Sequence, residues 1–454
     1  MHFGLEPFAG YILYVAGVLA FVLSVCWRPI VGIYYLVPLI PLQTARYALN
    51  GLPLGQSLVE IILLGVLLGL VVRGEQILPK TSWNLVLSVY AIFTFVSLCM
   101  GSLFLGSGLP ISLSGIDQRM ADWTNYMTMP LLLFLTAATV RETRQMKTLI
   151  LLMCAATLLL DRSFWDTVSG RDFSAFSYDL QDESTAGYAG VNGMAAFMAE
   201  ISVVLLALAV FERKRLFKSG YLTLFFCSAV CLMYSLSREA YLAFLAGCLF
   251  VGLMKQRKVL VLLAVLASTW SVWAPRAVVE RVEMTYDKNY GQLDHSSQVR
   301  VDLWEEGLHL FEANPLLGQG FDTYAYTKHV HGYGDSHNIY VKVLVETGII
   351  GLLLFLWLMA KTFWAGYQLF RRAQDPFLSS IGLGLAAWMV CATVVNFFGD
   401  RWTFLQIDGY MWVLAGLVAQ AWVLEQRVVL AADRAAVGNG DLPNALEPQA
   451  TAGV

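Results

Sequence analysis

The sequence has few charged residues for its length. Of its 454 residues, 14% are charged and 57% are hydrophobic, whereas soluble domains average about 25% charged and about 45–50% apolar residues. This apolar excess is too large for a single buried core and indicates a chain that uses lipid as its solvent. The formal net charge of −3 is small, so nucleic acid is not an expected partner.

Motifs for metal, nucleotide and disulfide chemistry are also missing. The seven cysteines lie in or beside apolar stretches and none forms a CxxC pair, so neither a disulfide framework nor a zinc site is expected. The sequence contains no DxD pair and no glycine-rich phosphate loop. We therefore expect no metal ion and no cofactor, and we expect arginines to meet the charge of any leaving group.

Long apolar runs are the main feature that is present. A helix needs about 20 apolar residues to cross the hydrocarbon core. The sequence therefore predicts an all-α polytopic membrane protein with about 12 or 13 spans, the run 30–42 being short enough for a re-entrant segment. The candidate spans are 10–26, 30–42, 57–72, 83–105, 124–140, 147–160, 193–211, 220–235, 239–254, 258–274, 339–360, 378–398 and 403–424.

Basic residues in alternate loops predict the orientation of the chain. Loops such as 141–147, 212–218 and 255–258 are rich in Lys and Arg, and such loops face the cytoplasm. The segment 275–337 then lies on the outer side of the membrane. The expected parts are spans in 1–274, a periplasmic catalytic loop in 275–337, further spans in 338–424 and a cytoplasmic tail in 425–454, disordered after about Val429.

The segment 275–337 concentrates the titratable side chains. It contains ten acidic residues, five basic residues and five of the six histidines. His337 stands near its end, directly after Asp335 and Ser336, either of which can cap a following helix. An imidazole there can remove a proton from a hydroxyl, or it can be a capping or interfacial histidine.

Two arginines stand where positive charge is either costly or useful. Arg300 lies four residues before Trp304, a spacing that puts both side chains on one helix face. Its guanidinium can hold two diphosphate oxygens or make an ordinary surface salt bridge. Arg238 lies in a very short turn between two spans, where a charge needs a partner or a function, and Glu239 offers such a partner.

Further candidates lie at the ends of other spans. Arg401, beside Asp400 between the last two spans, is open to the same two interpretations as Arg238. Asn192 follows Gly187 and Gly190 at the start of a span. Glycines in such a place can admit a sugar, or they can form a plain turn.

In chain order, these motifs resemble those of the O-antigen ligase/polymerase family of bacterial inner-membrane proteins. The resemblance is sharpest over about 220–360. It departs from the family at Glu239, where family members often have a small residue, and this changes the charge near Arg238. The matching stretches are Gly187…Asn192, Ser237-Arg238, Arg300…Trp304, Asn314-Pro-Leu-Leu-Gly-Gln-Gly320 and Ser336-His-Asn338…Glu346-Thr-Gly348-Ile-Ile-Gly351.

The resemblance implies a glycosyltransferase of the bacterial inner (plasma) membrane, with membrane lipid around it and its active site facing the periplasm. It implies an undecaprenyl-diphosphate-linked glycan as donor and a glycan or lipid A–core as acceptor. By motif match, His337 carries over as the base that activates the acceptor hydroxyl, and Arg238 and Arg300 carry over as diphosphate ligands. Asp400 would orient His337, on its position alone. The further candidates for substrate binding are Asn192, Trp304, Asn338, Arg401 and Asp400.

Two other functions stay open at the level of sequence. A polysaccharide polymerase of the same family transfers the growing chain to the next repeat unit and uses the same donor chemistry as a ligase. A transporter of lipid-linked sugar would be expected to contain internal repeats with broken helices. No such two-half symmetry is evident, and the charged residues gather in external loops instead.

Overall fold

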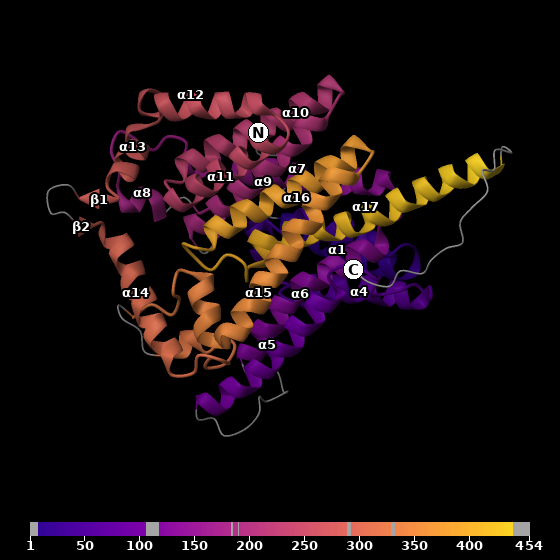
Figure 1. Cartoon of the computed structure of the whole chain (residues 1–454), viewed down its shortest axis with the longest axis horizontal. Helices are drawn as coiled ribbons and strands as arrows, with labels where there is room; N and C mark the ends of the chain where they lie inside the picture. Colours follow the sequence, from indigo (N-terminus) through magenta and orange to yellow (C-terminus); the bar gives the residue numbers. More distant parts are fainter. Residues whose placement is uncertain are drawn as a thin grey trace.

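The structure, a computed structural model, describes residues 8–105, 118–182, 185–188, 190–287, 292–327 and 332–438. Nearly all of its regular structure is helical, which confirms the expected all-α class (Figure 1). The helices of the first half are α1 (Ala9–Cys26), α2 (Ile30–Leu39), α3 (Gln43–Tyr47), α4 (Leu58–Val72), α5 (Asn84–Phe104), α6 (Gln118–Thr139), α7 (Thr143–Val168), α8 (Tyr178–Asp182) and α9 (Val191–Phe211).

The second half continues with helices and one small hairpin. Strands β1 (Tyr286–Asp287) and β2 (Gln292–Leu293) pair antiparallel, with Tyr286 opposite Leu293. The helices are α10 (Arg215–Tyr234), α11 (Arg238–Met254), α12 (Arg257–Trp273), α13 (Arg276–Glu283), α14 (His295–Glu312), the 3₁₀ helix η2 (Tyr324–Tyr326), α15 (Ile339–Arg372), α16 (Pro376–Val395) and α17 (Leu405–Gly438).

Length and apolar composition decide which helices can cross a membrane. Eight of the described helices qualify, namely α1, α5, α7, α9, α10, α15, α16 and α17. The pair α12 and α13, bent by 107°, makes a ninth if it is counted as one span. A multi-pass membrane protein is thus confirmed, but fewer helices qualify than the 12 or so expected. Every predicted span coincides with a helix, yet some helices are too short, such as α2 with 10 residues and α4 with 15.

The centre of the molecule is formed by helices that are buried on nearly all sides. Almost the whole of α9 is buried, and an all-round apolar helix is expected in such a place. Helix α16 packs against α9, α11 and α15. Its Gly382 allows the contact with α15, since an added Cβ would lie 2.7 Å from the carbonyl oxygen of Gly366. The short turn between α16 and α17 is thereby held at the middle of the molecule.

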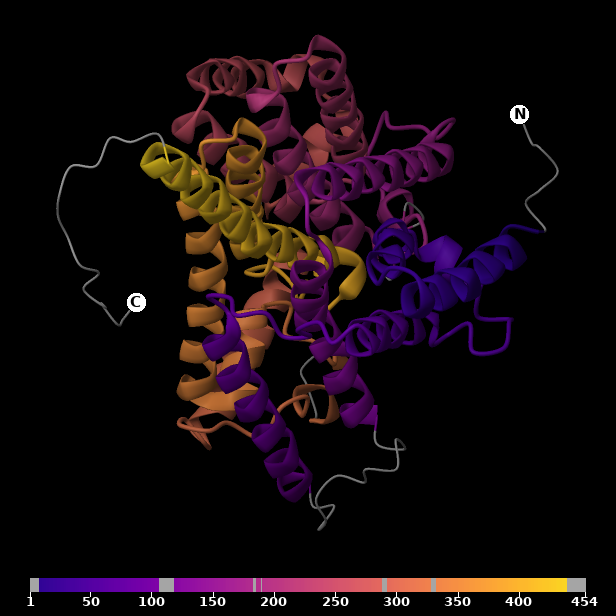
Figure 2. The same ribbon diagram turned by 90° about the vertical axis from the view of Figure 1, so that its right-hand side faces the viewer.

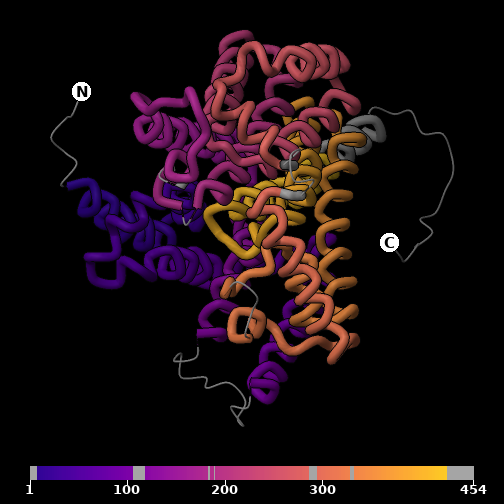
Figure 3. The backbone as a smooth tube through the Cα atoms, turned by 90° about the vertical axis from the view of Figure 1, so that its left-hand side faces the viewer, coloured from indigo at the N-terminus to yellow at the C-terminus, as the bar shows by residue number. Residues whose placement is uncertain are grey.

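Two groups of helices flank this centre. Helices α1, α2 and α4 pack on one another and lie together at one side, as Figure 2 and Figure 3 both show. Helix α5 runs beside the first half of α15 (Figure 2). Helix α17 packs on α6, α9, α15 and α16, and α6 in turn packs on α2, α4 and α5.

Helix α15 is broken at Gly348, where φ is +65°. The chain after α14 enters this break: the Gln319 N–H donates to the Val345 carbonyl (2.9 Å) and the Gly320 N–H to the Glu346 carbonyl (2.7 Å). A Cβ at position 348 would lie 2.3 Å from the backbone of Leu316. Glycine is therefore required at this position, both for the positive φ and for the close backbone approach.

The C-terminal tail differs from its prediction over the residues described. Helix α17 continues through Val429 to Gly438, so disorder from about Val429 was a wrong expectation up to that residue. The end of a helix that extends beyond a buried centre can stay helical because of the helix propensity of its residues. The end of α17 is rich in alanine, which has the highest propensity. The rest of the tail, like His329 and His331, lies outside the described residues.

Candidate functional site

Two cavities lie next to each other, and each is dominated by charge of one sign. The basic cavity, about 650 Å³ in volume, is lined by Arg281, Arg300, Arg401, His295 and His337, with Asp335 as its carboxylate. The acidic cavity, about 580 Å³ in volume, is lined by the carboxylates of Glu60, Asp122, Asp322, Asp335, Glu346 and Asp400 and by the cations Arg46 and Lys342. Asp335, Phe404 and Gln406 line both cavities, so the two meet at these residues.

One buried carboxylate holds two of the arginines of the basic cavity. The side chain of Glu239 on α11 is 2% exposed, and its Oε2 lies 3.1 Å from Nη2 of Arg300 on α14. Its Oε1 lies 2.8 Å from Nη2 of Arg401 in the turn between α16 and α17. Three separate elements are thus tied together at the wall of the cavity. The pairing of Glu239 with Arg238 that the sequence offered is not the one formed.

Arg238 instead anchors the start of α14. Its Nη2 lies 3.0 Å from Oδ2 of Asp294, and its Nη1–H donates to Thr285 (2.8 Å). Asp294 caps α14 by accepting from the Ser297 N–H. Burial raises the pKa of Asp294, but the hydrogen bonds from Ser297 and Arg238 outweigh this and the pKa lies below its usual value. Arg238 is not among the residues that line the basic cavity, so it positions α14 there.

Arg281 on α13 lines the basic cavity, although sequence analysis did not select it. Its guanidinium lies over the rings of Phe176 (4.8 Å) and Tyr178 (5.5 Å), and the residue is 5% exposed. Its Nη1 lies 3.6 Å from Asp294. Neither its Nε nor its Nη1 makes a hydrogen bond to another described residue. A buried guanidinium with free donors is suited to an anionic ligand. The only sequence signal was one more basic residue in a short amphipathic helix.

His337 lies at the edge of the basic cavity, directly before α15. Its backbone is left-handed (φ +50°), its N–H donates to Asp335 Oδ1 (3.0 Å), and its Nδ1 lies 3.5 Å from Asp335 Oδ2. Burial lowers its pKa; Asp335 opposes this, while Arg300 and Arg401 lower the pKa further. The imidazole is therefore neutral at neutral pH, and its Nε2 can accept a proton. Asp335, and not the predicted Asp400, is the carboxylate beside it.

The segment that carries His337 is fixed from both sides. Asn338 caps α15, its side chain accepting from the N–H groups of Tyr340 (3.0 Å) and Val341 (3.3 Å). The expected cap, Asp335 or Ser336, is thus two or three residues too early. The Trp304 indole N–H donates to the Ser336 carbonyl (3.1 Å). Trp304 and Asn338 therefore position His337 and line neither cavity, whereas Asn192 does line the basic cavity.

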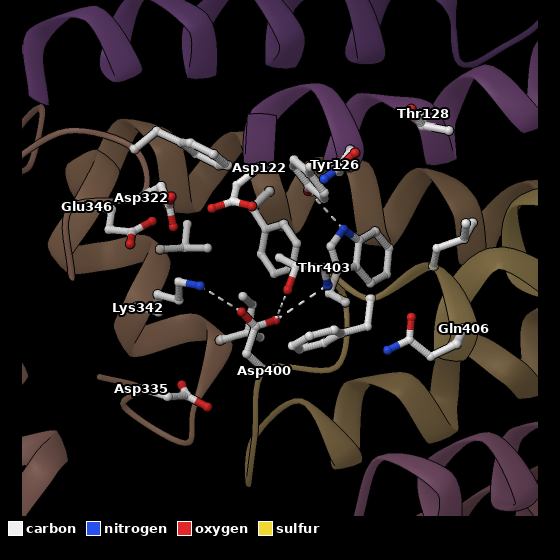
Figure 4. Close-up of a pocket in the computed structure, with 18 of the residues that line it drawn as sticks. Asp122, Tyr126, Thr128, Asp322, Asp335, Lys342, Glu346, Asp400, Thr403 and Gln406 are labelled. Atoms are coloured by element: carbon white, nitrogen blue, oxygen red, sulfur yellow. Dashed lines mark hydrogen bonds and ion pairs between the residues drawn. The ribbon is translucent and has the colours of Figure 1, made fainter. Parts of the chain in front are cut away.

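Asp400 and Arg401, neighbours in sequence, face different cavities. Asp400 accepts from the Lys342 ammonium (2.8 Å) and from the Thr403 hydroxyl (2.9 Å) on the acidic side (Figure 4). Arg401 lines the basic side. The turn owes its shape to Asn396, a residue that sequence analysis missed. Its Oδ1 accepts from the N–H groups of Arg401 and Trp402, each at 3.0 Å.

The two cavities have different chemical capacities. The guanidinium groups of the basic cavity can hold phosphate oxygens, and the neutral imidazole beside them can take a proton. The carboxylates of the acidic cavity can accept hydrogen bonds from hydroxyl or ammonium groups. Among the residues that the structure describes, no group of three or more His, Cys, Asp or Glu side chains is arranged to hold a metal ion.

The central part of the chain matches a known family. Residues 223–356 match the family model described as O-antigen ligase. This segment of the chain is therefore similar to O-antigen ligases. The matching segment contains Arg281, Arg300 and His337, and hence most of the charged lining of the basic cavity. The comparison with curated proteins found no match.

Proposed function

We propose that this protein acts as an O-antigen ligase-like enzyme, which transfers a glycan from undecaprenyl diphosphate to a sugar hydroxyl at the periplasmic face of the bacterial inner membrane. The observation that carries the proposal is the position of His337. Its imidazole, kept neutral by burial and by nearby arginines, lines the basic cavity and lies 3.5 Å from Asp335, which lines both cavities.

The diphosphate of the donor binds in the basic cavity. Arg281, Arg300 and Arg401 present three guanidinium groups whose charge cannot be lost. Hydrogen bonds between ions of opposite charge are the strong ones, and guanidinium can make two at once. When the diphosphate enters, it takes up donors that Arg281 does not use and shares those that Arg300 and Arg401 give to Glu239.

The chemical step is a single displacement. His337 Nε2 accepts the proton of the acceptor hydroxyl as its oxygen forms a bond to the anomeric carbon of the donor. The bond from that carbon to the phosphate oxygen breaks, and its electrons leave with undecaprenyl diphosphate into the arginines. One displacement inverts the anomeric centre. The new imidazolium is stabilised by Asp335, 3.5 Å from Nδ1.

The organisation of the chain follows from this proposal. The segment 275–337, with α13, α14 and the β1–β2 hairpin, is a periplasmic catalytic segment between the spans of 1–274 and those of 338–424. The loops rich in Lys and Arg, such as 141–147 and 212–218, then face the cytoplasm as the positive-inside rule requires. The residues after 424 form a cytoplasmic tail.

The test is the glycan profile of a deletion strain complemented with wild type, His337→Ala or His309→Ala. His309 is the matched control, because its side chain lies on the same segment and is 79% exposed. We expect His337→Ala to lower transfer by about 10²–10⁴-fold, the usual contribution of a general base, and His309→Ala to restore the wild-type profile.

The material that accumulates in the deletion strain identifies the reaction. Long polymer retained on undecaprenyl diphosphate means a ligase, and single repeat units on the carrier mean a polymerase. Lipid-linked sugar trapped in the cytoplasmic leaflet means a transporter and overturns the proposal. A wild-type profile from His337→Ala removes His337 as the base.

A further inference from the structure

The acidic cavity carries an excess of negative charge next to the proposed base. Six of its lining side chains are carboxylates and two are cations. One cation, Lys342, is paired with Asp400 at 2.8 Å. Figure 4 shows Asp122, Asp322 and Glu346 gathered together, with Lys342 between Glu346 and Asp400. A ligand in this cavity therefore meets carboxylates whose charge is not balanced within the lining.

These carboxylates are held in place by the fold. Glu346, 3% exposed, accepts from the Tyr324 N–H (3.2 Å) through its Oε1. Asp122 accepts from the Gln118 amide (2.9 Å). Asp322 has a left-handed backbone (φ +57°). This residue turns the chain after it leaves the break in α15 and before η2 begins. Fixed acceptors of this kind can bind the hydroxyl groups of a sugar without reorganising.

Aromatic rings form the remaining wall of the acidic cavity. Tyr126 and Phe321 are stacked, with ring centroids 5.9 Å apart. The Tyr126 hydroxyl donates to Tyr90 (3.0 Å) and accepts from the Trp402 indole N–H (3.0 Å). Tyr126 is buried and its polar atoms are used within the protein, so it supports the half-buried ring of Phe321, which is left for the ligand. Rings beside a few fixed polar groups are the usual lining of a small-molecule site, and flat rings match the C–H faces of a pyranose.

On the basis of the proposed function, we infer that the acidic cavity receives the acceptor glycan, and that this acceptor ends in an uncharged or amine-bearing sugar. A uronic acid or a phosphorylated sugar is excluded there by repulsion from Asp122 and Asp322. The basic cavity takes the anionic part of the donor, so the two cavities together orient both substrates about His337.

The test uses the full chain in nanodiscs with inorganic pyrophosphate present at saturation. Pyrophosphate occupies the arginines, so an anionic sugar cannot bind to them instead. Saturation-transfer NMR titrations then compare three probes of one shape, namely methyl glucoside, methyl glucosaminide and methyl glucuronide. We expect the glucuronide to bind about tenfold or more weakly than the other two, as expected for repulsion between like charges at partly buried sites.

Substitutions locate the effect in the cavity. Asp322→Asn removes one charge and keeps a residue that tolerates positive φ, and it should reduce the discrimination several-fold. Asp122→Asn, on the half-buried N-terminal turn of α6, gives the same test if the first variant fails to fold. Asp166→Asn on α7, with its side chain 64% exposed, is the matched control and should change nothing.

The outcomes separate this inference from the proposed function. Equal binding of glucuronide and glucoside to wild type, or a ratio unchanged in both cavity variants, overturns the inference while pyrophosphate binding still supports the function. Absence of pyrophosphate binding contradicts the proposed function itself. Weak glucuronide binding that strengthens in Asp322→Asn or Asp122→Asn, and not in Asp166→Asn, supports the inference.

Discussion

The basic and acidic cavities are similar in size but handle their charges in opposite ways. Behind the basic cavity, Arg300 and Arg401 are tied to Glu239, and Arg281 lies near Asp294. Each guanidinium therefore has a carboxylate that keeps it in place without lining the cavity. In the acidic cavity the carboxylates themselves form the lining. In the basic cavity, the charge of the arginines is thus partly neutralised by carboxylates behind them. In the acidic cavity, the carboxylates themselves face a ligand.

Removal of Glu239, the carboxylate shared by Arg300 and Arg401, should have the largest effect on the difference between the two cavities. Glu239→Gln leaves Arg300 and Arg401 unpaired in a buried wall, which should lower the free energy of unfolding by about 3–5 kcal/mol. Inorganic pyrophosphate should then restore more stability to the variant than to wild type, because it replaces the lost negative charge. Thermal unfolding in detergent with and without pyrophosphate measures both effects. Equal stabilisation of the two proteins would contradict the placement of the diphosphate.

Removal of one lining arginine should have the next largest effect. Arg300→Ala deletes charge-assisted hydrogen bonds to the diphosphate and should weaken pyrophosphate binding about tenfold to a hundredfold, since each such bond contributes about 1.5–3 kcal/mol. Calorimetric titration measures the affinity. Arg276→Ala on α13, with its side chain 78% exposed, is the control and should bind as wild type does. An unchanged affinity in Arg300→Ala would exclude this arginine from the site.

A change at the break in α15 should affect the acidic cavity alone. Gly348→Ala forces a residue with Cβ into a positive φ and against the backbone of Leu316, a strain of about 1–3 kcal/mol. Acceptor binding should weaken because Glu346 and Asp322 move, while pyrophosphate binding should stay as in wild type. Gly220→Ala on α10, where an added Cβ meets open space, controls for loss of backbone freedom. Equal losses of acceptor affinity and pyrophosphate affinity would mean that the two cavities are not independent.

The smallest predicted effect is a pH dependence of acceptor selectivity. Burial raises the pKa of Asp322 to about 6, although Lys342 opposes this. The residue is therefore charged at neutral pH and becomes neutral as the pH falls through about 6. Discrimination against glucuronide should fall by a few-fold between about pH 7.5 and about pH 5, measured by the same NMR titration. The titratable groups that face Asp322 are Lys342, Asp122, Arg119, Asp400 and Glu346.

Asp322→Asn is the control for this dependence. The variant has no group at this position that titrates near pH 6, so its selectivity should stay constant over the same range. A pH dependence that persists in the variant would assign the effect to another group.

Local features of the sequence were enough for the helical class, the multi-pass architecture and the similarity to O-antigen ligases. A run of apolar residues forms a helix in lipid wherever it stands, since the backbone has no other way to satisfy its hydrogen bonds. His337, Arg300, Arg401 and Asn192 were also found from sequence, and all four line the basic cavity. Chemically distinctive side chains at the ends of apolar runs are visible without a structure.

Pairings between distant residues needed the tertiary structure. Glu239 was expected beside Arg238, its neighbour, but it bonds to Arg300 and Arg401, 61 and 162 positions away. Asp400 was expected to orient His337, but it bonds to Lys342, 58 positions away. A residue on a helix points to one side, so its neighbour in sequence is seldom its partner in space.

The sequence by itself determined which segments are helical and which reactive groups stand at their ends. The tertiary structure decided which charges are neutralised, that Arg281 lines the basic cavity, and that Asp400 and Arg401 face different cavities. The physical reason is the range of the forces. Apolar burial and backbone hydrogen bonding act within one segment, whereas the state of a buried charge depends on whatever the fold brings within a few ångströms of it.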